Sequence, residues 1–165
     1  MVREISAGGV VVRKRDKVWW MAAIAPPEES ESGAPDPSEG APRKRKPLLA
    51  LPKGLVDPGE KPLQTALREV REETGITADP IVKLGDIKYV YTRTWAGNER
   101  VFKIVSFYLM RYRAGRINNL IDEMRVEVDR ALWIPLEEAP RRLAYKGEKE
   151  MAKRALEYVL THTDA

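Results

Sequence analysis

The chain of 165 residues contains no cysteine and a single histidine, His162. Without a thiol it can form neither a disulfide framework nor a cysteine nucleophile, and it cannot build a zinc–thiolate or iron–sulfur centre. The histidine lies next to the C-terminus, where chains fray, so a catalytic imidazole in the core is not expected. The chemistry of the protein must therefore depend on carboxylates, hydroxyls and cationic side chains.

Long apolar runs are also missing. The longest, from Val18 to Ala25, has eight residues, whereas a membrane-spanning helix needs about 20. The first residues, Met-Val-Arg-Glu-Ile, contain no apolar signal-peptide region. We therefore expect a soluble cytoplasmic protein with no membrane partner, and the length predicts a single domain over residues 1–165.

Residues 26–47 differ in composition from the rest of the chain, since they hold six of the twelve prolines and no large aliphatic or aromatic side chain. Such a segment buries too little surface to offset the entropy lost on ordering, which predicts a flexible Pro-rich insertion. Its basic end, Arg43 to Lys46, is typical of a solvated loop and also of nucleic-acid or localisation signals. A frayed tail is expected at residues 161–165.

Strand and helix patterns alternate along the remainder of the chain. β-branched and apolar stretches predict strands at residues 5–13, 18–24, 81–84, 87–92, 102–111 and 131–135, the first two forming a hairpin. Helical spacing of apolar residues predicts helices at 62–74, 136–143 and 149–160. This mixed order indicates an α/β or α+β fold.

The helix predicted over residues 62–74 is rich in carboxylates. Three of them fall within an arc of about 100°: Glu69, Glu72 and Glu73. The less polar residues lie roughly opposite: Leu63, Leu67, Val70 and Thr74. Like charges at these spacings destabilise a helix, so the sequence predicts either a bound cation or a solvated face neutralised by Arg68 and Arg71. Oxygen ligands without His or Cys favour Mg²⁺, with Mn²⁺ as a substitute.

The helix belongs to a longer motif, since residues 54–76 read GLVDPGEKPLQTALREVREETGI. This segment matches, at every defining position, the pattern Gly, five residues, Glu, seven residues, Arg-Glu, an aliphatic residue, any residue, Glu-Glu, any residue, Gly and an aliphatic residue. In this respect the chain resembles the Nudix hydrolases. The resemblance implies a Nudix fold, an α/β/α sandwich with a mixed central β-sheet in which residues 54–76 form a loop–helix–loop.

The same resemblance implies a pyrophosphohydrolase in which water attacks phosphorus with the help of Mg²⁺. The metal ligands it implies are Glu69, Glu72, Glu73, Glu127 and the backbone at Gly54. Arg68 joins the implied catalytic set by bracing the loop against the helix together with Glu60. The general base would be Glu69 or Glu127, with Glu123 as a rival of Glu127.

Segments outside the motif resemble the asymmetric diadenosine tetraphosphate hydrolases: 51–54, 89–92, 99–110, 135–139 and 145–150. The resemblance implies diadenosine tetraphosphate as substrate and ATP and AMP as products. The cations it suggests for the polyphosphate are Lys53, Arg100, Lys103 and Lys146. Tyr91 and Tyr145 would stack on the adenines, with Tyr89 and Trp95 behind them.

Other functions stay open at this point. A different Nudix activity would act on nucleoside triphosphates, capped RNA ends or diphosphoinositol polyphosphates. A non-catalytic nucleotide- or RNA-binding domain is less favoured, because every carboxylate of the motif is present. The expected partner is a small nucleotide, with nucleic acid only as an RNA 5′ end, and the expected state is a monomer or weak dimer.

The net charge of +4 is unevenly distributed. Residues 54–76 carry −2 and residues 26–47 carry −1, which leaves +7 on the rest of the chain. An acidic segment within a basic body suits a polyphosphate that is chelated to a metal.

Overall fold

The computed structural model of the protein describes residues 1–26 and 48–162, so all of the expected insertion except Pro26 lies outside the described residues. Its centre is a six-stranded sheet with the order β4-β5-β1-β2-β6, and β3 also pairs with β1. The strands are β1 (Val2–Arg15), β2 (Val18–Ala25), β3 (Lys53–Leu55), β4 (Ile76–Arg93), β5 (Glu99–Gly115) and β6 (Arg130–Pro135). β1 runs parallel to β5, whereas the other pairs are antiparallel.

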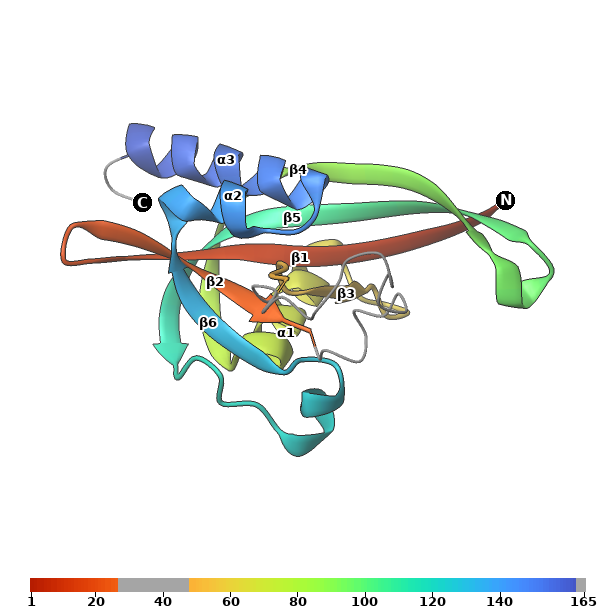
Figure 1. Ribbon diagram of the computed structural model, residues 1–165, viewed down its shortest axis with the longest axis horizontal. Coiled ribbons are helices and arrows are strands. Elements are labelled where there is room, and N and C mark those ends of the chain that lie inside the picture. Colours follow the sequence, from red (N-terminus) through yellow and green to blue (C-terminus); the bar gives the residue numbers. More distant parts are fainter. Residues whose placement is uncertain (27–47, 163–165) are drawn as a thin grey trace, which may run out of the picture.

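Helices cover both faces of this mixed sheet, as Figure 1 shows with α3 (Lys146–Thr161) above it and α1 (Pro62–Thr74) below. Successive side chains of β1 point to opposite faces of the sheet, so they pack against different helices. Val10 and Val12 pack in the cluster that contains α3, and Ala7 and Val11 pack in the cluster that contains α1. The α/β sandwich expected from the sequence is confirmed.

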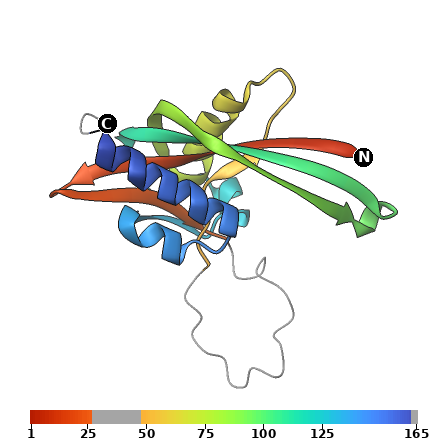
Figure 2. The ribbon, with the colours of Figure 1, turned by 90° about the horizontal axis from the view of Figure 1, so that it is seen from above.

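The two longest strands differ from the expectation. The segments 81–84 and 87–92 belong to one continuous strand, β4, which pairs along its length with β5. Register shifts near Pro80 and Gly85 absorb the residues that interrupt the strand pattern in the sequence. The pair is closed by η3 (Thr94–Ala96), and Figure 2 shows this hairpin reaching beyond α3 beside the N-terminal end of β1.

The C-terminal region is divided more finely than expected. The helix expected at 136–143 is a 3₁₀ turn, η5 (Leu136–Glu138), followed by the short α2 (Ala139–Arg142), because Pro140 fits only a first helical turn. A further 3₁₀ turn, η4 (Asp122–Val126), precedes β6. α3 continues to Thr161, and the ring of His162 stacks on Tyr158 with centroids 3.8 Å apart. These first residues of the expected frayed tail are thus ordered against the helix, and 163–165 lie outside the described part.

The segment before α1 is attached to the sheet from both sides. Leu49 bridges to Leu143 and Ala50 to Ile24. Further along, the N–H of Gly9 donates to the carbonyl of Pro52 at 3.1 Å, and β3 places Gly54 opposite Ala7. In the described ranges no helix is long and apolar enough to cross a membrane.

Candidate active site

Two of the three glutamates of α1 point into the molecule. Glu69 and Glu73 are only 9% and 6% exposed, whereas Glu72 is partly exposed. Of the four less polar residues expected opposite the glutamates, Val70 and Thr74 are buried, whereas Leu63 and Leu67 are only partly covered. The two buried glutamates lie against β3, at Lys53 and Gly54. A fully solvated acidic face is excluded.

Glu73 is held by the strand that precedes the helix. The backbone N–H of Lys53 donates to Glu73 Oε1 at 2.9 Å. Burial raises the pKa of Glu73 to about 8, and the neighbouring charge of Glu69 adds to the rise. A buried carboxyl that resists ionisation in the absence of a cation is well suited to receive one.

Glu69 lies against Gly54. A Cβ built on Gly54 would stand 2.2 Å from the carboxyl carbon of Glu69, so a larger residue here would displace the Glu69 carboxylate from its present position. Burial raises the pKa of Glu69, and the charges of Glu72 and Glu127 raise it further, whereas Arg68 lowers it. The glycine of the motif thus lets the backbone approach the carboxylate closely.

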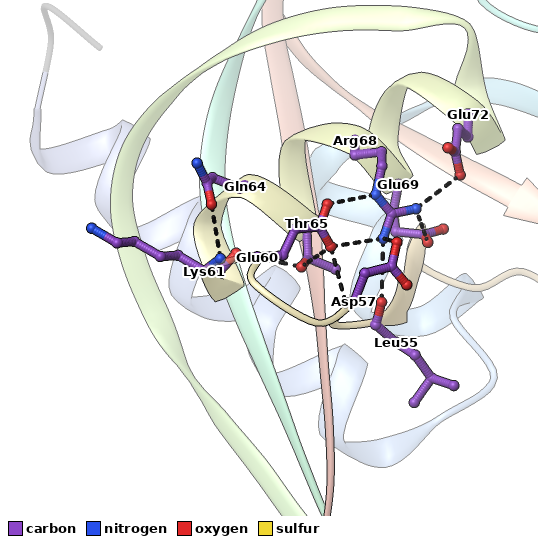
Figure 3. Close-up of polar contacts among 9 residues, drawn as sticks. All are labelled: Leu55, Asp57, Glu60, Lys61, Gln64, Thr65, Arg68, Glu69 and Glu72. Atoms are coloured by element: carbon purple, nitrogen blue, oxygen red, sulfur yellow. Dashed lines mark hydrogen bonds and ion pairs between the residues drawn. The ribbon is translucent and has the colours of Figure 1, made fainter.

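Arg68 connects the loop to the helix, as Figure 3 shows. Its Nε donates to Glu60 Oε2 at 2.7 Å, and its Nη2 donates to the carbonyl of Leu55 at 3.3 Å. Its Nη1 contacts Glu69 at 2.8 Å and Glu72 at 3.2 Å. The hydrogen bonds that Glu60 accepts from Arg68, from the hydroxyl of Thr65 and from the backbone N–H of Asp57 lower its pKa to about 2. The brace expected between Arg68 and Glu60 is present.

A second cluster joins β3 to α3. Lys53 Nζ contacts Glu148 Oε2 at 2.7 Å and lies 5.5 Å from the ring centre of Tyr145. The other oxygen of Glu148 accepts the N–H of Leu51 at 2.7 Å. Lys53 therefore lies between a buried carboxylate and the exposed aromatic ring that the sequence suggested as an adenine platform.

A third group lies further out on the sheet, where β1, β4 and β5 extend toward η3. Lys103 Nζ contacts Glu4 Oε1 at 3.0 Å. The hydroxyl of Tyr91 donates to Glu4 Oε2 at 3.1 Å. Tyr89 and Tyr91 have ring centres 6.2 Å apart. Two expected substrate residues, Lys103 and Tyr91, are thus brought together by Glu4.

The other expected site residues, Arg100, Lys146 and Glu127, belong to none of these three groups of contacts. Strand alternation places Arg100 on the opposite face of β5 from Lys103. Lys146, the first residue of α3, and Glu127, which follows η4, are both exposed. Glu127 nevertheless contributes to the raised pKa values of Glu69 and Glu73. This electrostatic coupling favours Glu127 over Glu123 as a further acidic group of the site.

The donor set fits a divalent cation. Carboxylates from Glu69, Glu72 and Glu73 beside the side-chain-free Gly54 are hard oxygen ligands of the kind that Mg²⁺ prefers. No three Asp, Glu or His side chains are preassembled as a metal cluster within residues 1–26 and 48–162. Instead the Arg68 guanidinium stands between Glu69 and Glu72, which shows that a positive charge is accommodated there.

Glu148 and Glu4 were missed as functional candidates. Glu148 carried a usable signal, because it lies three, four and seven residues from the buried Met151, Ala152 and Ala155 on one side of α3. A carboxylate on an apolar helix face implies a buried partner. Glu4 carried no such signal, since its partners are distant in sequence and only strand pairing brings them together.

The motif at residues 54–76 lies within a longer match to a known protein family. A family model described as the NUDIX domain matches residues 3–155 of the chain. The chain belongs to the Nudix family.

Two mycobacterial relatives cover much of this Nudix chain. The putative mutator protein MutT4 of Mycobacterium tuberculosis is 37% identical over 158 residues, which are 96% of this chain and 56% of that protein. The 8-oxo-(d)GTP phosphatase of Mycolicibacterium smegmatis is 31% identical over 64% of this chain and 29% of that protein. The chain therefore spans about half the length of the first relative and less than a third of the second.

The similarity to the tetraphosphatases covers a shorter segment at a higher identity. The asymmetrical bis(5'-nucleosyl)-tetraphosphatase of Rattus norvegicus is 64% identical over 33 residues, which are 20% of this Nudix chain and 22% of that protein. Among solved structures, a binary complex of the C. elegans Ap4A hydrolase matches with a TM-score of 0.60 at 19% identity, covering 96% of this chain and 98% of that one. The structural match shows the shared fold.

Proposed function

We propose that this chain is a Mg²⁺-dependent Nudix pyrophosphohydrolase that cleaves a phosphoanhydride bond of a nucleoside polyphosphate. The observation that carries the proposal is the pair of buried carboxyls, Glu69 and Glu73, gathered against Gly54 and Lys53. Apolar packing alone gives no reason to bury two carboxyls, because burial without a cation disfavours their ionised forms.

Glu69, Glu72 and Glu73 would hold the metal ion, with Glu127 as a further ligand or base. When bound, Mg²⁺ would lower the pKa of the attacking water and neutralise charge on the phosphate oxygens. Glu69 suits the role of general base because burial raises its pKa, which makes it a stronger proton acceptor than an ordinary carboxylate. The Arg68 brace would keep the loop and the helix in register during the reaction.

Within this class we propose diadenosine tetraphosphate as the substrate and ATP and AMP as the products. Two features support it. Lys53 lies beside the exposed ring of Tyr145, and Tyr91 contacts Glu4 together with Lys103 at the outer part of the sheet. Each end thus offers an aromatic face for a base, and Lys53 adds a cation near the phosphates at the inner end. The high local identity to the rat tetraphosphatase agrees with this substrate.

A nucleoside triphosphate is the second candidate. It is favoured by the match over 96% of the chain to a protein named as a putative mutator protein and by the relative named as an 8-oxo-(d)GTP phosphatase. Such a substrate would use the base-binding face at one end only.

A substrate panel tests the assignment. Diadenosine tetraphosphate, 8-oxo-dGTP, dGTP and a 5′-triphosphorylated RNA would be incubated with the full chain and Mg²⁺, and the products separated by anion-exchange chromatography. Equal amounts of ATP and AMP from the first compound, at the highest kcat/KM, support the proposal. A clear preference for a triphosphate overturns the substrate assignment, and no turnover of any compound overturns the hydrolase assignment.

A further inference from the structure

Glu4 collects three donors from two other strands. Its Oε2 accepts a hydrogen bond from Arg93 Nη2 at 2.7 Å and one from the hydroxyl of Tyr91 at 3.1 Å. Its Oε1 contacts Lys103 Nζ at 3.0 Å. The side chain of Glu4 is only 15% exposed, so the solvent screens these contacts only in part. β1 thus contributes an anion to a group of cationic and aromatic residues on β4 and β5.

This group shares a face of the sheet with Lys53. Lys53 pairs with Gly8, and Glu4 lies on the same side of β1 as Gly8 because successive side chains alternate. The separation along β1 is four residues, or roughly 13 Å. Figure 2 shows that α3 does not extend over this outer region, and no other α-helix of the described residues covers it. A polyphosphate held at Lys53 could therefore extend toward Glu4.

The charges of the group cancel. Arg93 contacts Glu99 at 3.0 Å as well as Glu4, and Lys103 contacts Glu4. The two cations are thus matched by two carboxylates. Although burial by itself would raise it, hydrogen bonds from Lys103 and Arg93 leave the pKa of Glu4 below its ordinary value, so Glu4 is ionised at neutral pH. A phosphate that reaches this group therefore finds Arg93 and Lys103, the cations that could bind it, already paired with the Glu4 carboxylate.

Glu4 also orients an aromatic ring. Its hydrogen bond fixes the hydroxyl end of Tyr91, whose ring lies 6.2 Å from that of Tyr89. Neutralised cations next to a fixed aromatic ring favour an uncharged base over another phosphate.

We infer that Glu4 is a specificity-determining residue that selects a substrate with a nucleoside, rather than a free terminal phosphate, at its distal end. The inference rests on the proposed function, because it concerns the distal end of the same substrate. The Glu4 carboxylate already binds Lys103 and Arg93, so neither cation is free to bind a terminal phosphate, and its own negative charge repels that phosphate.

The test compares diadenosine tetraphosphate with adenosine 5′-tetraphosphate, which has the same number of phosphates and lacks the distal adenosine. Glu4→Gln should lower KM for adenosine 5′-tetraphosphate by about three- to tenfold, as expected for removing one unfavourable, partly screened charge. Its kcat should change little. The KM for diadenosine tetraphosphate should change by less than about twofold, so the preference between the two compounds narrows.

Glu99→Gln is the matched control. Glu99 contacts Arg93, but in the described part of the chain it forms no ion pair or hydrogen bond with the side chain of Lys103 or Tyr91, and its own side chain is 40% exposed. Its effect on the preference should be smaller than that of Glu4→Gln. Circular dichroism and the melting temperature establish that both variants fold. An unchanged preference in folded Glu4→Gln, or an equal effect of Glu99→Gln, overturns the inference.

A binding measurement tests this inference independently of the proposed function. It can also be made on a Glu4→Gln variant that has lost activity. Calorimetric titration with inorganic tripolyphosphate, without Mg²⁺, should show tighter binding to Glu4→Gln than to the parent chain. This gain in affinity for tripolyphosphate should disappear when Glu4→Gln is combined with Lys103→Gln. If the parent chain hydrolyses neither compound but this pattern holds, the proposed function fails and the role of Glu4 in excluding phosphate stands. Equal affinity of Glu4→Gln and the parent chain contradicts that role.

Discussion

Lys53 and Glu148 lie 95 positions apart in the chain, yet the ammonium nitrogen of Lys53 contacts a carboxylate oxygen of Glu148 at 2.7 Å. The same lysine donates its backbone N–H to Glu73 at 2.9 Å. Glu148, only 3% exposed, also accepts the N–H of Leu51. Through these contacts α3 holds the segment on which the position of Glu73 depends.

Glu148→Gln should therefore reduce both stability and catalysis. Glutamine can still accept the N–H of Leu51, but it leaves Lys53 without its charge partner. Because Lys53 is partly exposed, the free energy of unfolding should fall by only about 1–2 kcal/mol. The measurement is urea unfolding together with kcat and KM for the preferred substrate.

Glu150→Gln is a control for this change, since Glu150 is an exposed residue of the same helix. It should alter the free energy of unfolding by less than about 0.5 kcal/mol. If Glu148→Gln proves as stable and as active as Glu150→Gln, the contact between α3 and Lys53 is not needed for the site.

Replacing Glu73 by Gln should abolish Mg²⁺-dependent turnover while the fold is retained. The amide can accept the N–H of Lys53 but cannot provide an anionic ligand to a cation. Turnover is measured over a range of Mg²⁺ concentrations, and folding by circular dichroism. Glu72→Gln should reduce turnover less, because Glu72 is partly exposed. Full activity of Glu73→Gln would remove Glu73 from the metal site.

The stability of the metal-free protein should depend on pH through Glu73. The folded protein holds its proton up to a pKa of about 8, whereas the ordinary value is 4.5. Between these values the folded state binds more protons than the unfolded state, so the free energy of unfolding falls as the pH rises. Melting temperatures in EDTA should decrease across this window.

Two comparisons isolate that effect. The decrease should be smaller in Glu73→Gln, which has no carboxyl to ionise. It should also be smaller with saturating Mg²⁺, because a cation stabilises the ionised carboxylate and its binding releases the proton. Identical pH profiles for Glu73→Gln and the parent chain would mean that Glu73 does not titrate in this range.

Arg68→Lys should impair the site although the charge is kept. An ammonium cannot reproduce the guanidinium contacts that reach Glu60, Glu69 and the carbonyl of Leu55 together. We expect kcat to fall at least about tenfold, as is typical when positioning by a guanidinium is lost. Arg71→Lys, at an exposed position of the same helix, should leave kcat within about twofold. Equal kinetics for the two variants would refute a positioning role for Arg68.

Local elements were predictable where the sequence carries a short-range signal. The limits of α1 agree with the prediction, because Pro62 fits the first turn and Gly75 adopts the left-handed conformation that ends the helix. The β1–β2 hairpin follows from two apolar stretches around a polar turn. The continuity of β4 was not predictable, because its breaks are bulges that only pairing with β5 makes tolerable.

The sequence by itself determined the motif, the class of fold and the identity of the carboxylates, because those depend on residue types at fixed local spacings. Only the tertiary structure decided that Glu69 and Glu73 are buried against β3, and that Glu148 and Glu4 bind the lysines expected to meet phosphate. Those pairings join residues from distant segments. Their charge balance arises when strands and helices pack, and no local pattern encodes it.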